Sequence, residues 1–179
     1  MNNTVFLRKA DMNESVKILQ FYNGVINSIR CSEFKPKWNS NYPDLDYIKT
    51  SIEDGELFVC SENDTIIACV VLNNRFSPEY GEIKWIEDVK SEEVTVIHTF
   101  AVDSNFSGKG IGKQIFNQIR EKSIKNNRKS IRIDIIDGNI GAQKVFESFG
   151  FEYIDTVEIF HDAVGLKKFH LYELVLREE

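Results

Sequence analysis

The chain has 179 residues, of which 42% are hydrophobic and 28% are charged, and its formal net charge is −6 at pH 7. This length and composition are typical of a globular protein with a sizeable core, so we expect a single domain over residues 1–179. The acidic charge argues against sequence-independent binding of nucleic acid, which needs a clustered basic face.

The sequence also argues against membrane insertion, disulfides and a metal centre. The first residues, MNNTVFLRKADMNES, contain no apolar core of signal-peptide length, and no later stretch is long and apolar enough to span a bilayer. We therefore expect a cytoplasmic protein with no membrane partner. The cysteines lack C-x-x-C spacing, so we expect neither a metal site nor a disulfide framework; they are Cys31, Cys60 and Cys69.

The N-terminal part of the chain predicts one strand and two helices. Val5–Arg8 reads as a strand, and Asp11–Ile29 reads as an amphipathic helix in which Asp11 and Glu14 have capping-box spacing. A second helix is expected near Asp44–Glu53. The apolar stripe expected on the first helix consists of Val16, Leu19, Val25, Ile26 and Ile29.

The next part predicts a hairpin and a long connection. Glu56–Ser61 and Thr65–Asn73 are apolar on both faces, which is typical of central strands covered by helices. Asn74–Glu92 is long for a connection between strands, and long connections are often functional. Its candidates for contact with a ligand are Tyr80, Glu82 and Trp85. The alternative is that Trp85 anchors the loop.

The most informative stretch runs from Val94 to Phe116. Val94–Val102 is rich in β-branched and aromatic residues and predicts a strand, whereas Ile111, Ile115 and Ile119 recur at helical spacing. The loop between them is SGKGIG, in which glycines permit sharp turns and close approach of a ligand. A glycine loop that enters a helix N-terminus presents several N–H groups to one point, so we expect an anion site suited to phosphate.

Two common nucleotide motifs do not fit this loop. A phosphate-binding loop of the Walker A type needs Lys followed by Ser or Thr, but Lys113 is followed by Gln114. The dinucleotide fingerprint needs G-x-G-x-x-G, but the spacing here is G-x-G-x-G.

After the helix that follows the glycine loop, we expect a strand at Ile131–Ile136, a helix from Asn139, and two strands that His161–Lys168 join. The two final strands are expected at Glu152–Phe160 and Phe169–Leu176.

Two segments carry a resemblance to a known family. The strand end Ala101-Val102-Asp103, followed by a loop with Ser107, Gly110 and Gly112 at the positions of [RQ]-x-x-G-x-[GA], resembles the acetyl-CoA-binding motif of the GNAT superfamily of N-acetyltransferases. Residues 139–151, NIGAQKVFESFGF, resemble the N-x-x-A-x-x-[YF]-x-x-x-G-F segment of the same family, in the same order along the chain. The resemblance implies an α/β (α+β) fold with a mixed central sheet that splays at the acetyl-CoA cleft and helices on both faces.

The resemblance also implies an activity, which is direct transfer of acetyl from the cosubstrate acetyl-CoA to a primary amine of a small molecule, peptide or protein, without a metal. The implied cofactor-binding residues are Phe100, Ala101, Val102, Ser107, Gly108, Lys109, Gly110, Ile111, Gly112, Lys113, Asn139 and Phe146. The resemblance implies that the first two helices and the loop between them form one wall of the acceptor site, with Phe34, Trp38 and Tyr42 as its candidates; the alternative is that they pack on the core. The long connection adds Tyr80, Glu82 and Trp85 as candidates for this wall. A homodimer is left open.

The candidate base is His98, which lies three residues before Ala101, as a catalytic histidine does in the serotonin N-acetyltransferase branch. Its substitutes are Glu82, Glu93 or a chain of waters. The sequence departs from the family twice: Ser107 replaces the usual Arg or Gln, and Phe146 replaces a tyrosine that many members use to protonate the departing thiolate. Tyr153 or a water is the substitute acid.

Two other functions stay open on this sequence. The first is a non-catalytic acyl-CoA-binding protein on the same fold, which the loss of the tyrosine at Phe146 motivates. The second is an acyltransferase that uses a longer acyl-CoA. Turnover distinguishes the first alternative from an acetyltransferase, because a binding module holds CoA without releasing its thiol.

Overall fold

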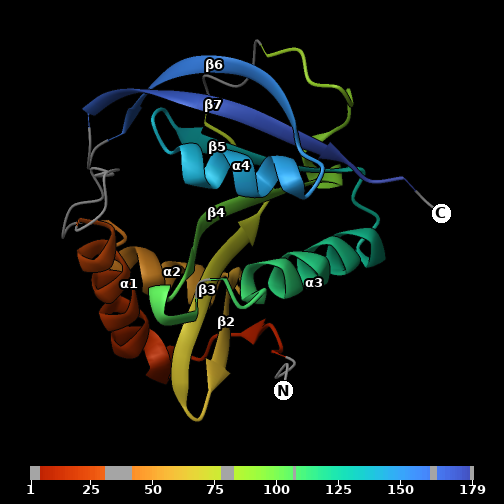
Figure 1. Cartoon of the computed structure of the whole chain (residues 1–179). Helices are drawn as coiled ribbons and strands as arrows, with labels where there is room; N and C mark the ends of the chain where they lie inside the picture. The colour runs from red at the N-terminus through yellow and green to blue at the C-terminus, as the bar shows by residue number, and fades with distance from the viewer. Residues whose placement is uncertain (1–4, 31–41, 78–82, 107, 162–164, 178–179) are drawn as a thin grey trace. The chain divides into compact units, whose positions relative to one another are not determined.

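The computed structural model describes residues 5–30, 42–77, 83–106, 108–161 and 165–177 (Figure 1). The strands are β1 (Arg8–Lys9), β2 (Leu57–Glu62), β3 (Thr65–Asn73), β4 (Val94–Val102), β5 (Ser130–Ile136), β6 (Glu152–His161) and β7 (Gly165–Val175). The α-helices are α1 (Ser15–Arg30), α2 (Leu45–Glu53), α3 (Ile111–Lys125) and α4 (Ile140–Ser148). The short 3-10 helices are η1 (Met12–Glu14), η3 (Ser91–Glu93) and η4 (Ser104–Phe106).

The strands form one mixed sheet with the hydrogen-bonded order β1-β2-β3-β4-β5-β7-β6. This sheet and the helices between its strands confirm the expected α/β fold. The chain divides into two compact units: the first consists of Met1–Leu72 and Thr99–Gln118, and the second consists of Asn73–His98 and Ile119–Glu179. Strand β4 and helix α3 each contribute residues to both units.

In the first unit, the predicted capping box opens the first helical segment. The side chain of Asp11 accepts the N–H of Asn13 at 3.0 Å, and the carboxylate of Glu14 accepts the N–H of Asp11 at 2.9 Å. The first turn is the 3-10 helix η1, and α1 follows it directly. Arg8 also donates to both Glu14 oxygens, at 2.8 and 2.6 Å, so this carboxylate links the helix start to β1.

The apolar stripe of α1 differs from the predicted one. Val16 is 54% exposed, whereas Ile18 and Tyr22 are fully buried. The face of the helix is set by its packing on the β2–β3 hairpin, where these two side chains join a core with Leu57 and Val59. Each such buried side chain contributes about 1.5–3 kcal/mol to folding. The remaining buried members of this core are Val25, Ile48, Ile66, Cys69, Val71 and Ala101.

The predicted first strand at Val5–Arg8 is wrong in its extent, because β1 contains only Arg8 and Lys9. The preceding residues use side chains of α3 as hydrogen-bond partners instead of a neighbouring strand. Gln118 accepts the N–H of Leu7 at 2.9 Å and donates to the carbonyl of Val5 at 2.8 Å. Two glutamines at helical spacing therefore satisfy this backbone, since Gln114 accepts the N–H of Val5 at 3.3 Å.

In the second unit, β5 pairs in parallel with β4 and antiparallel with β7. The β4–β5 register runs from Val94–Ser130 to Ile97–Ile133. The predicted start of the last strand at Phe169 is wrong, because β7 begins at Gly165 and pairs with β6 from His161 onward. After Gly165 the segment contains two lysines, Lys167 and Lys168, and lacks the apolar pattern of a strand, but its pairing with β6 extends the hairpin through it.

A buried ion pair holds the segment before β4 against β5 and β7. Nε of Arg132 donates to Glu173 at 2.7 Å, and both side chains are almost completely buried. Glu173 also accepts the N–H of Ile86 at 2.7 Å, and Arg132 donates to the carbonyl of Glu87 at 2.7 Å. The guanidinium carbon of Arg132 lies 4.1 Å from the ring centroid of Trp85. This network fixes the second half of the long connection.

None of the helices in the described part of the chain combines the length and the apolar character that spanning a bilayer requires.

Candidate functional site

The stretch from β4 to α3 forms the predicted strand, loop and helix. Strand β4 ends at Val102, and its next residue, Asp103, donates its N–H to the carbonyl of Ile67 on β3 at 2.9 Å. The carboxylate of Asp103 then accepts the N–H of Asn105 at 2.8 Å, and its carbonyl accepts that of Phe106 at 2.9 Å. These bonds form the short helix η4 and turn the chain into the glycine loop.

The glycine loop needs its glycines. Gly108 and Gly110 have φ angles of +73° and +76°, which residues other than glycine rarely adopt. A Cβ built at Gly108, Gly110 or Gly112 meets no heavy atom within 4 Å. The backbone of the loop therefore borders open space, and a ligand can approach it closely.

The start of α3 supplies N–H donors beside this open space. Gln114 donates its N–H to Gly110 at 3.1 Å, and the N–H groups that precede it in the first turn have no acceptor within a helix. The helix end also carries a partial positive charge, which favours an anion. The side chain of Lys113 is exposed, and Nζ of Lys109 lies 4.8 Å from the ring centroid of Phe106. These donors fit the pyrophosphate of a CoA molecule, and Ser107 lies outside the described residues.

A strained residue in β4 was not anticipated from the sequence. Thr99 has a φ angle of +47°, which is an outlier for a β-branched residue within a strand. The hydroxyl of the fully buried Tyr22 donates to the carbonyl of Thr99 at 2.9 Å. Burial raises the pKa of Tyr22 well above its ordinary value, so the phenol stays protonated and keeps donating. The only signal in the sequence was a polar aromatic residue on the apolar face of a helix.

Strained backbone of this kind redirects the peptide groups that follow it. The next three residues are Phe100, Ala101 and Val102, the segment predicted to bind the cosubstrate through its main chain. The side chain of Ala101 is buried in the core of the first unit, whereas Phe100 and Val102 are half-buried. The side chains of these three residues therefore alternate between half-buried and buried positions, and Tyr22 holds the carbonyl of Thr99 just before them.

His98 precedes the strained residue and belongs to the second unit. Its Nε2 atom lies 2.9 Å from Oδ1 of Asn73 at the end of β3. Burial lowers the pKa of the imidazole below its ordinary value of 6.5, although the carboxylate of Asp134 and a backbone hydrogen bond with Arg75 act in the opposite direction. His98 is therefore neutral at pH 7, which is the form that accepts a proton.

Two predicted cofactor-binding residues lie on α4 in the second unit. Asn139 is the N-cap of this helix, and its Oδ1 atom accepts the N–H of Ala142 at 3.2 Å. Phe146 is 5% exposed, and its ring packs edge-to-face on Phe149 and Phe151 at centroid distances of 6.0 and 5.3 Å. The phenyl ring at this position fills an aromatic cluster.

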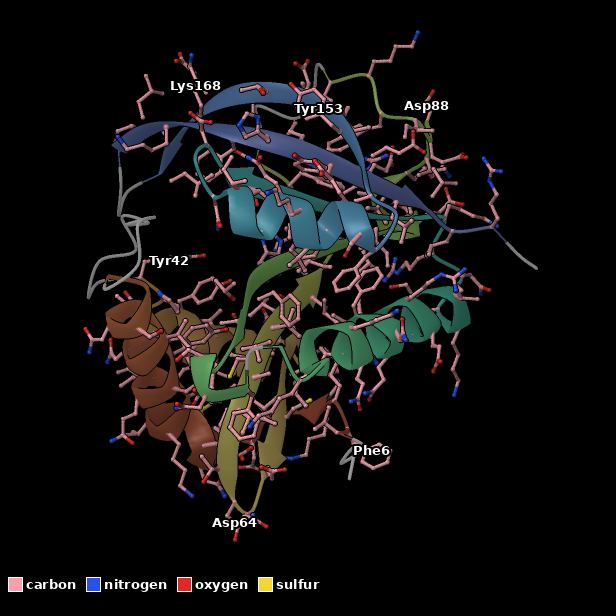
Figure 2. All side chains as sticks on the ribbon, in the orientation of Figure 1. Phe6, Tyr42, Asp64, Asp88, Tyr153 and Lys168 are labelled. Atoms are coloured by element: carbon pink, nitrogen blue, oxygen red, sulfur yellow. The ribbon has the colours of Figure 1, made fainter. Side chains whose placement is uncertain are left out.

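Tyr153, the substitute acid, is exposed on β6 (Figure 2). Its hydroxyl lies 2.8 Å from Oγ1 of Thr156, which in turn lies 2.8 Å from Nδ1 of His170. Nε2 of His170 lies 2.8 Å from Oδ1 of Asp137, and this contact holds the pKa of Asp137 below its usual value. The phenol thus ends a continuous chain of polar groups.

The remaining predicted residues separate into two groups. Trp85 stacks on the buried guanidinium of Arg132, a contact that favours the alternative in which it anchors the connection. The carboxylate of Glu93, a substitute base, accepts the N–H of Lys90 at 3.3 Å. Tyr42, another candidate for the acceptor wall, packs against Tyr47 of α2, with ring centroids 5.1 Å apart. Four further candidates for this wall lie outside the described residues, and they are Phe34, Trp38, Tyr80 and Glu82. The described residues contain no group of three or more His, Cys, Asp or Glu side chains that could hold a metal.

Comparison with known proteins places these features in a family. The model of the Acetyltransferase (GNAT) family matches residues 25–151. The chain is 29% identical over 124 residues to the N-acetyltransferase MJ1207 of Methanocaldococcus jannaschii, a match that covers 69% of this chain and 50% of that protein. It is 28% identical over 137 residues to the N-acetyltransferase YesJ of Bacillus subtilis, covering 76% of this chain and 70% of that one. Neither relative has a characterised activity.

Solved structures agree on the fold. A GNAT acetyltransferase from Streptococcus agalactiae matches with a TM-score of 0.80 and 18% identity, covering 100% of this chain and 99% of that one. YncA of Salmonella typhimurium, whose structure contains its cofactor acetyl-CoA, matches with a TM-score of 0.69 and 16% identity, covering 99% of this chain and 96% of that one. The matching family model covers most of the chain, and with it the glycine loop and the segment after Asn139, so the chain belongs to the GNAT family of acetyltransferases.

Proposed function

We propose that this protein transfers the acetyl group of acetyl-CoA directly to a primary amine of a small molecule, peptide or protein. The observation that carries the proposal is the backbone of the first unit between Val102 and Gln114. There, two left-handed glycines and the first turn of α3 present N–H donors to open space. An acetyl-CoA molecule bound there would supply a thioester as the acyl donor.

The residues of β4 are suited to the two demands of this reaction. An alkylammonium has a pKa near ~10, so the acceptor must lose a proton before it attacks. We assign that proton to the imidazole of His98, which burial keeps neutral. Polarisation of the thioester carbonyl requires an N–H donor, and we assign it to the main chain near Val102, beyond the strained Thr99. In this proposal Asn139 binds the pantetheine arm.

The departing thiolate sets a weaker demand. A thiol has a pKa of ~8.5 and leaves without full protonation, so the packed phenyl ring of Phe146 does not prevent catalysis. We assign the later proton to water or to Tyr153. We further propose a single domain over residues 1–179 and a cytoplasmic location.

The first experiment measures CoA release from acetyl-CoA, by thiol titration, across polyamines, aminoglycosides, amino acids and short peptides. His98→Gln keeps a hydrogen-bonding side chain opposite Asn73 but cannot accept a proton at neutral pH. We expect this variant to lose about 100-fold in turnover while it keeps its affinity for CoA. Turnover equal to that of the wild type would exclude His98 as the base and leave the enzyme assignment intact.

A second experiment tests the loop directly. Gly110→Ala places a Cβ on a left-handed residue that faces the open space, so we expect a loss of at least about tenfold in CoA affinity. Gly165→Ala is the matched control, because Gly165 also has a left-handed φ of +71° and nothing within 4 Å of its Cβ position. Equal affinities in the two variants would show that the loop does not hold CoA.

One observation favours a second function, a non-catalytic acyl-CoA-binding protein. The position of the family's acid is occupied by Phe146, which is committed to the packing of two other phenylalanines. In that case calorimetry detects CoA binding but no amine in the panel causes thiol release.

A further inference from the structure

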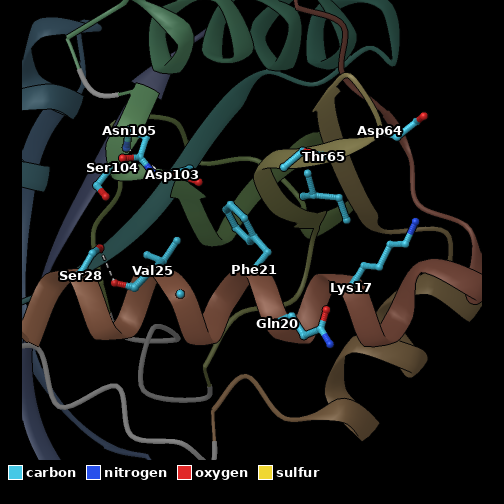
Figure 3. Close-up of a pocket in the computed structure, with 12 residues that line it drawn as sticks. Lys17, Gln20, Phe21, Val25, Ser28, Asp64, Thr65, Asp103, Ser104 and Asn105 are labelled. Carbon is cyan, nitrogen blue, oxygen red and sulfur yellow. Dashed lines mark hydrogen bonds between the residues drawn. The ribbon is translucent and has the colours of Figure 1, made fainter.

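A pocket of about 600 Å³ opens in the first unit, between one face of α1 and the ends of β3 and β4 (Figure 3). Its volume lies within the range of about 300–1,000 Å³ that is typical of pockets for small ligands. All its walls belong to the first unit. They come from α1 between Lys17 and Ser28, from Asp64 to Ile66, and from Asp103 to Asn105.

A glycine in the middle of α1 keeps this pocket open. Gly24 lies one turn after Phe21 on the pocket face, and a Cβ built on it meets nothing within 4 Å. Glycine is unfavourable inside a helix compared with alanine, and here no steric contact requires it. A larger residue at this position would favour the helix, but its side chain would enter the pocket between Phe21 and Ser28.

The two ends of the pocket differ in charge. In Figure 3 the amino group of Lys17 extends toward the side of the pocket that holds Asp64, and Asp103 lies at the other end beside Asn105. Lys17 is the cationic residue of the lining and lies at the end that holds Asp64, so the end at Asp103 favours a cation. Between the two ends the ring of Phe21 projects into the pocket, where it offers an apolar and cation-attracting surface.

We propose that this pocket binds an organic ammonium compound, with its charged nitrogen at Asp103 and its hydrocarbon part on Phe21 beside Gly24. The recognition elements are one carboxylate, neighbouring hydroxyl and amide oxygens of η4, and an aromatic face. The nitrogen bound at Asp103 lies five residues along the chain from His98, so it is not the nitrogen that His98 deprotonates. The compound is either an acetyl acceptor that carries a second amino group or an effector that is not acetylated, because both sources present the same chemistry.

The pocket is connected to the glycine loop through hydrogen bonds of the main chain. Asp103 accepts the N–H of Phe106 at 2.9 Å, and Phe106 accepts the N–H of Lys109 at 3.4 Å. A ligand that restrains Asp103 therefore restrains the loop that precedes α3. This coupling rests on the proposed function, and by linkage it makes the amine and CoA alter each other's affinity by the same factor.

The binding test uses phenethylammonium as the probe and 2-phenylethanol as its neutral counterpart of the same length, each titrated by calorimetry without acetyl-CoA. Asp103→Asn keeps an oxygen that can cap η4 but removes the charge, and Gly24→Leu fills the pocket while it favours the helix. We expect either variant to weaken ammonium binding by at least about tenfold. Asp64→Asn, at the other end, is the matched control and leaves the affinity unchanged.

Three results would overturn the proposal: equal binding of the alcohol and the ammonium, unchanged affinity in Gly24→Leu, or a loss in Asp64→Asn alone. A further measurement uses the trimethylated probe, which cannot be acetylated. If this probe competes with the acceptor in turnover, the pocket binds the acceptor; if it changes the rate without competing, the pocket binds an effector. Ammonium binding without any CoA binding refutes the proposed function and leaves the pocket assigned.

Discussion

Replacement of Glu173 by glutamine tests the buried network that anchors the long connection in the second unit. Glu173 is fully buried, and its two oxygens accept hydrogen bonds from Arg132 and from the backbone of Ile86 and Glu87. Glutamine retains one acceptor but removes the charge, which leaves the guanidinium of Arg132 buried at 4% exposure without a counterion.

The expected loss is large. Breaking a buried ion pair from one side costs about 3–5 kcal/mol, because the remaining charge stays desolvated. This is a substantial part of the roughly 5–15 kcal/mol by which a domain is stable. Glu173→Gln should therefore lower the midpoint of urea unfolding strongly, and the fluorescence of Trp85, which stacks on Arg132, should report the transition.

A double-mutant cycle separates the charge from the packing. Arg132→Met alone should be as harmful as Glu173→Gln, whereas Arg132→Met combined with Glu173→Leu should recover most of the loss, since apolar replacements of a buried pair are often neutral. Arg8→Met breaks an exposed pair with Glu14 and should cost less than about 1 kcal/mol. A loss below about 1 kcal/mol in Glu173→Gln, or a double variant as unstable as the sum of the singles, would refute this reasoning.

Three further predictions concern single side chains. Tyr22→Phe should cost about 1–2 kcal/mol in urea unfolding because it leaves the carbonyl of the strained Thr99 without its donor, and an unchanged free energy would contradict this restraint. Glu14 has its pKa lowered to about 2 from 4.5, chiefly by its hydrogen bond with Arg8, so its contribution is present above pH 4.5 and is lost as the pH falls toward 2. Because Arg8 is 48% exposed, Glu14→Gln should cost only about 1 kcal/mol at pH 7 and a small part of that at pH 2, and a constant difference at both pH values would refute it. The pKa of His98 in the folded protein lies below 6.5, so the unfolded chain takes up a proton at a higher pH than the folded chain does. The free energy of unfolding should therefore decrease as the pH is lowered below 6.5. His98→Gln should reduce this dependence in urea unfolding between about pH 5 and 7, and an unchanged dependence would contradict it.

The parts of the fold that were predicted correctly depend on neighbours in sequence. The capping box at Asp11, the strand Val94–Val102 and the N-cap at Asn139 each follow from residues a few positions apart. The prediction of the first strand was wrong because the backbone N–H of Leu7 donates to Gln118, more than 100 residues away, instead of to a neighbouring strand. No local pattern carries that information, since a glutamine on an exposed helix face looks the same with or without such a role.

The residues of the candidate site also divide into those whose conformation the local sequence predicts and those whose conformation depends on distant partners. The glycine loop was predictable because left-handed backbone selects glycine, and this selection is visible in the sequence. Thr99 was not, because it adopts a left-handed φ despite its β-branch, and the hydroxyl that restrains it comes from Tyr22, 77 residues earlier. The anchoring role of Trp85 depends on Arg132, which comes from a later strand and lies against its indole ring, so no local pattern predicts it.

The two proton transfers of the proposed reaction bear unequally on catalysis, and the chemistry explains why. An ammonium acceptor with a pKa near ~10 presents almost no nucleophile at neutral pH, whereas a thiolate with a conjugate pKa of ~8.5 leaves readily. The base is therefore the indispensable group and the acid is not. Selection can then fill the position of Phe146 for packing, as its contacts with Phe149 and Phe151 indicate, while His98 stays beside the strained residue of β4. On this argument the loss of the tyrosine is compatible with an enzyme as well as with a binding module, and thiol release distinguishes the two.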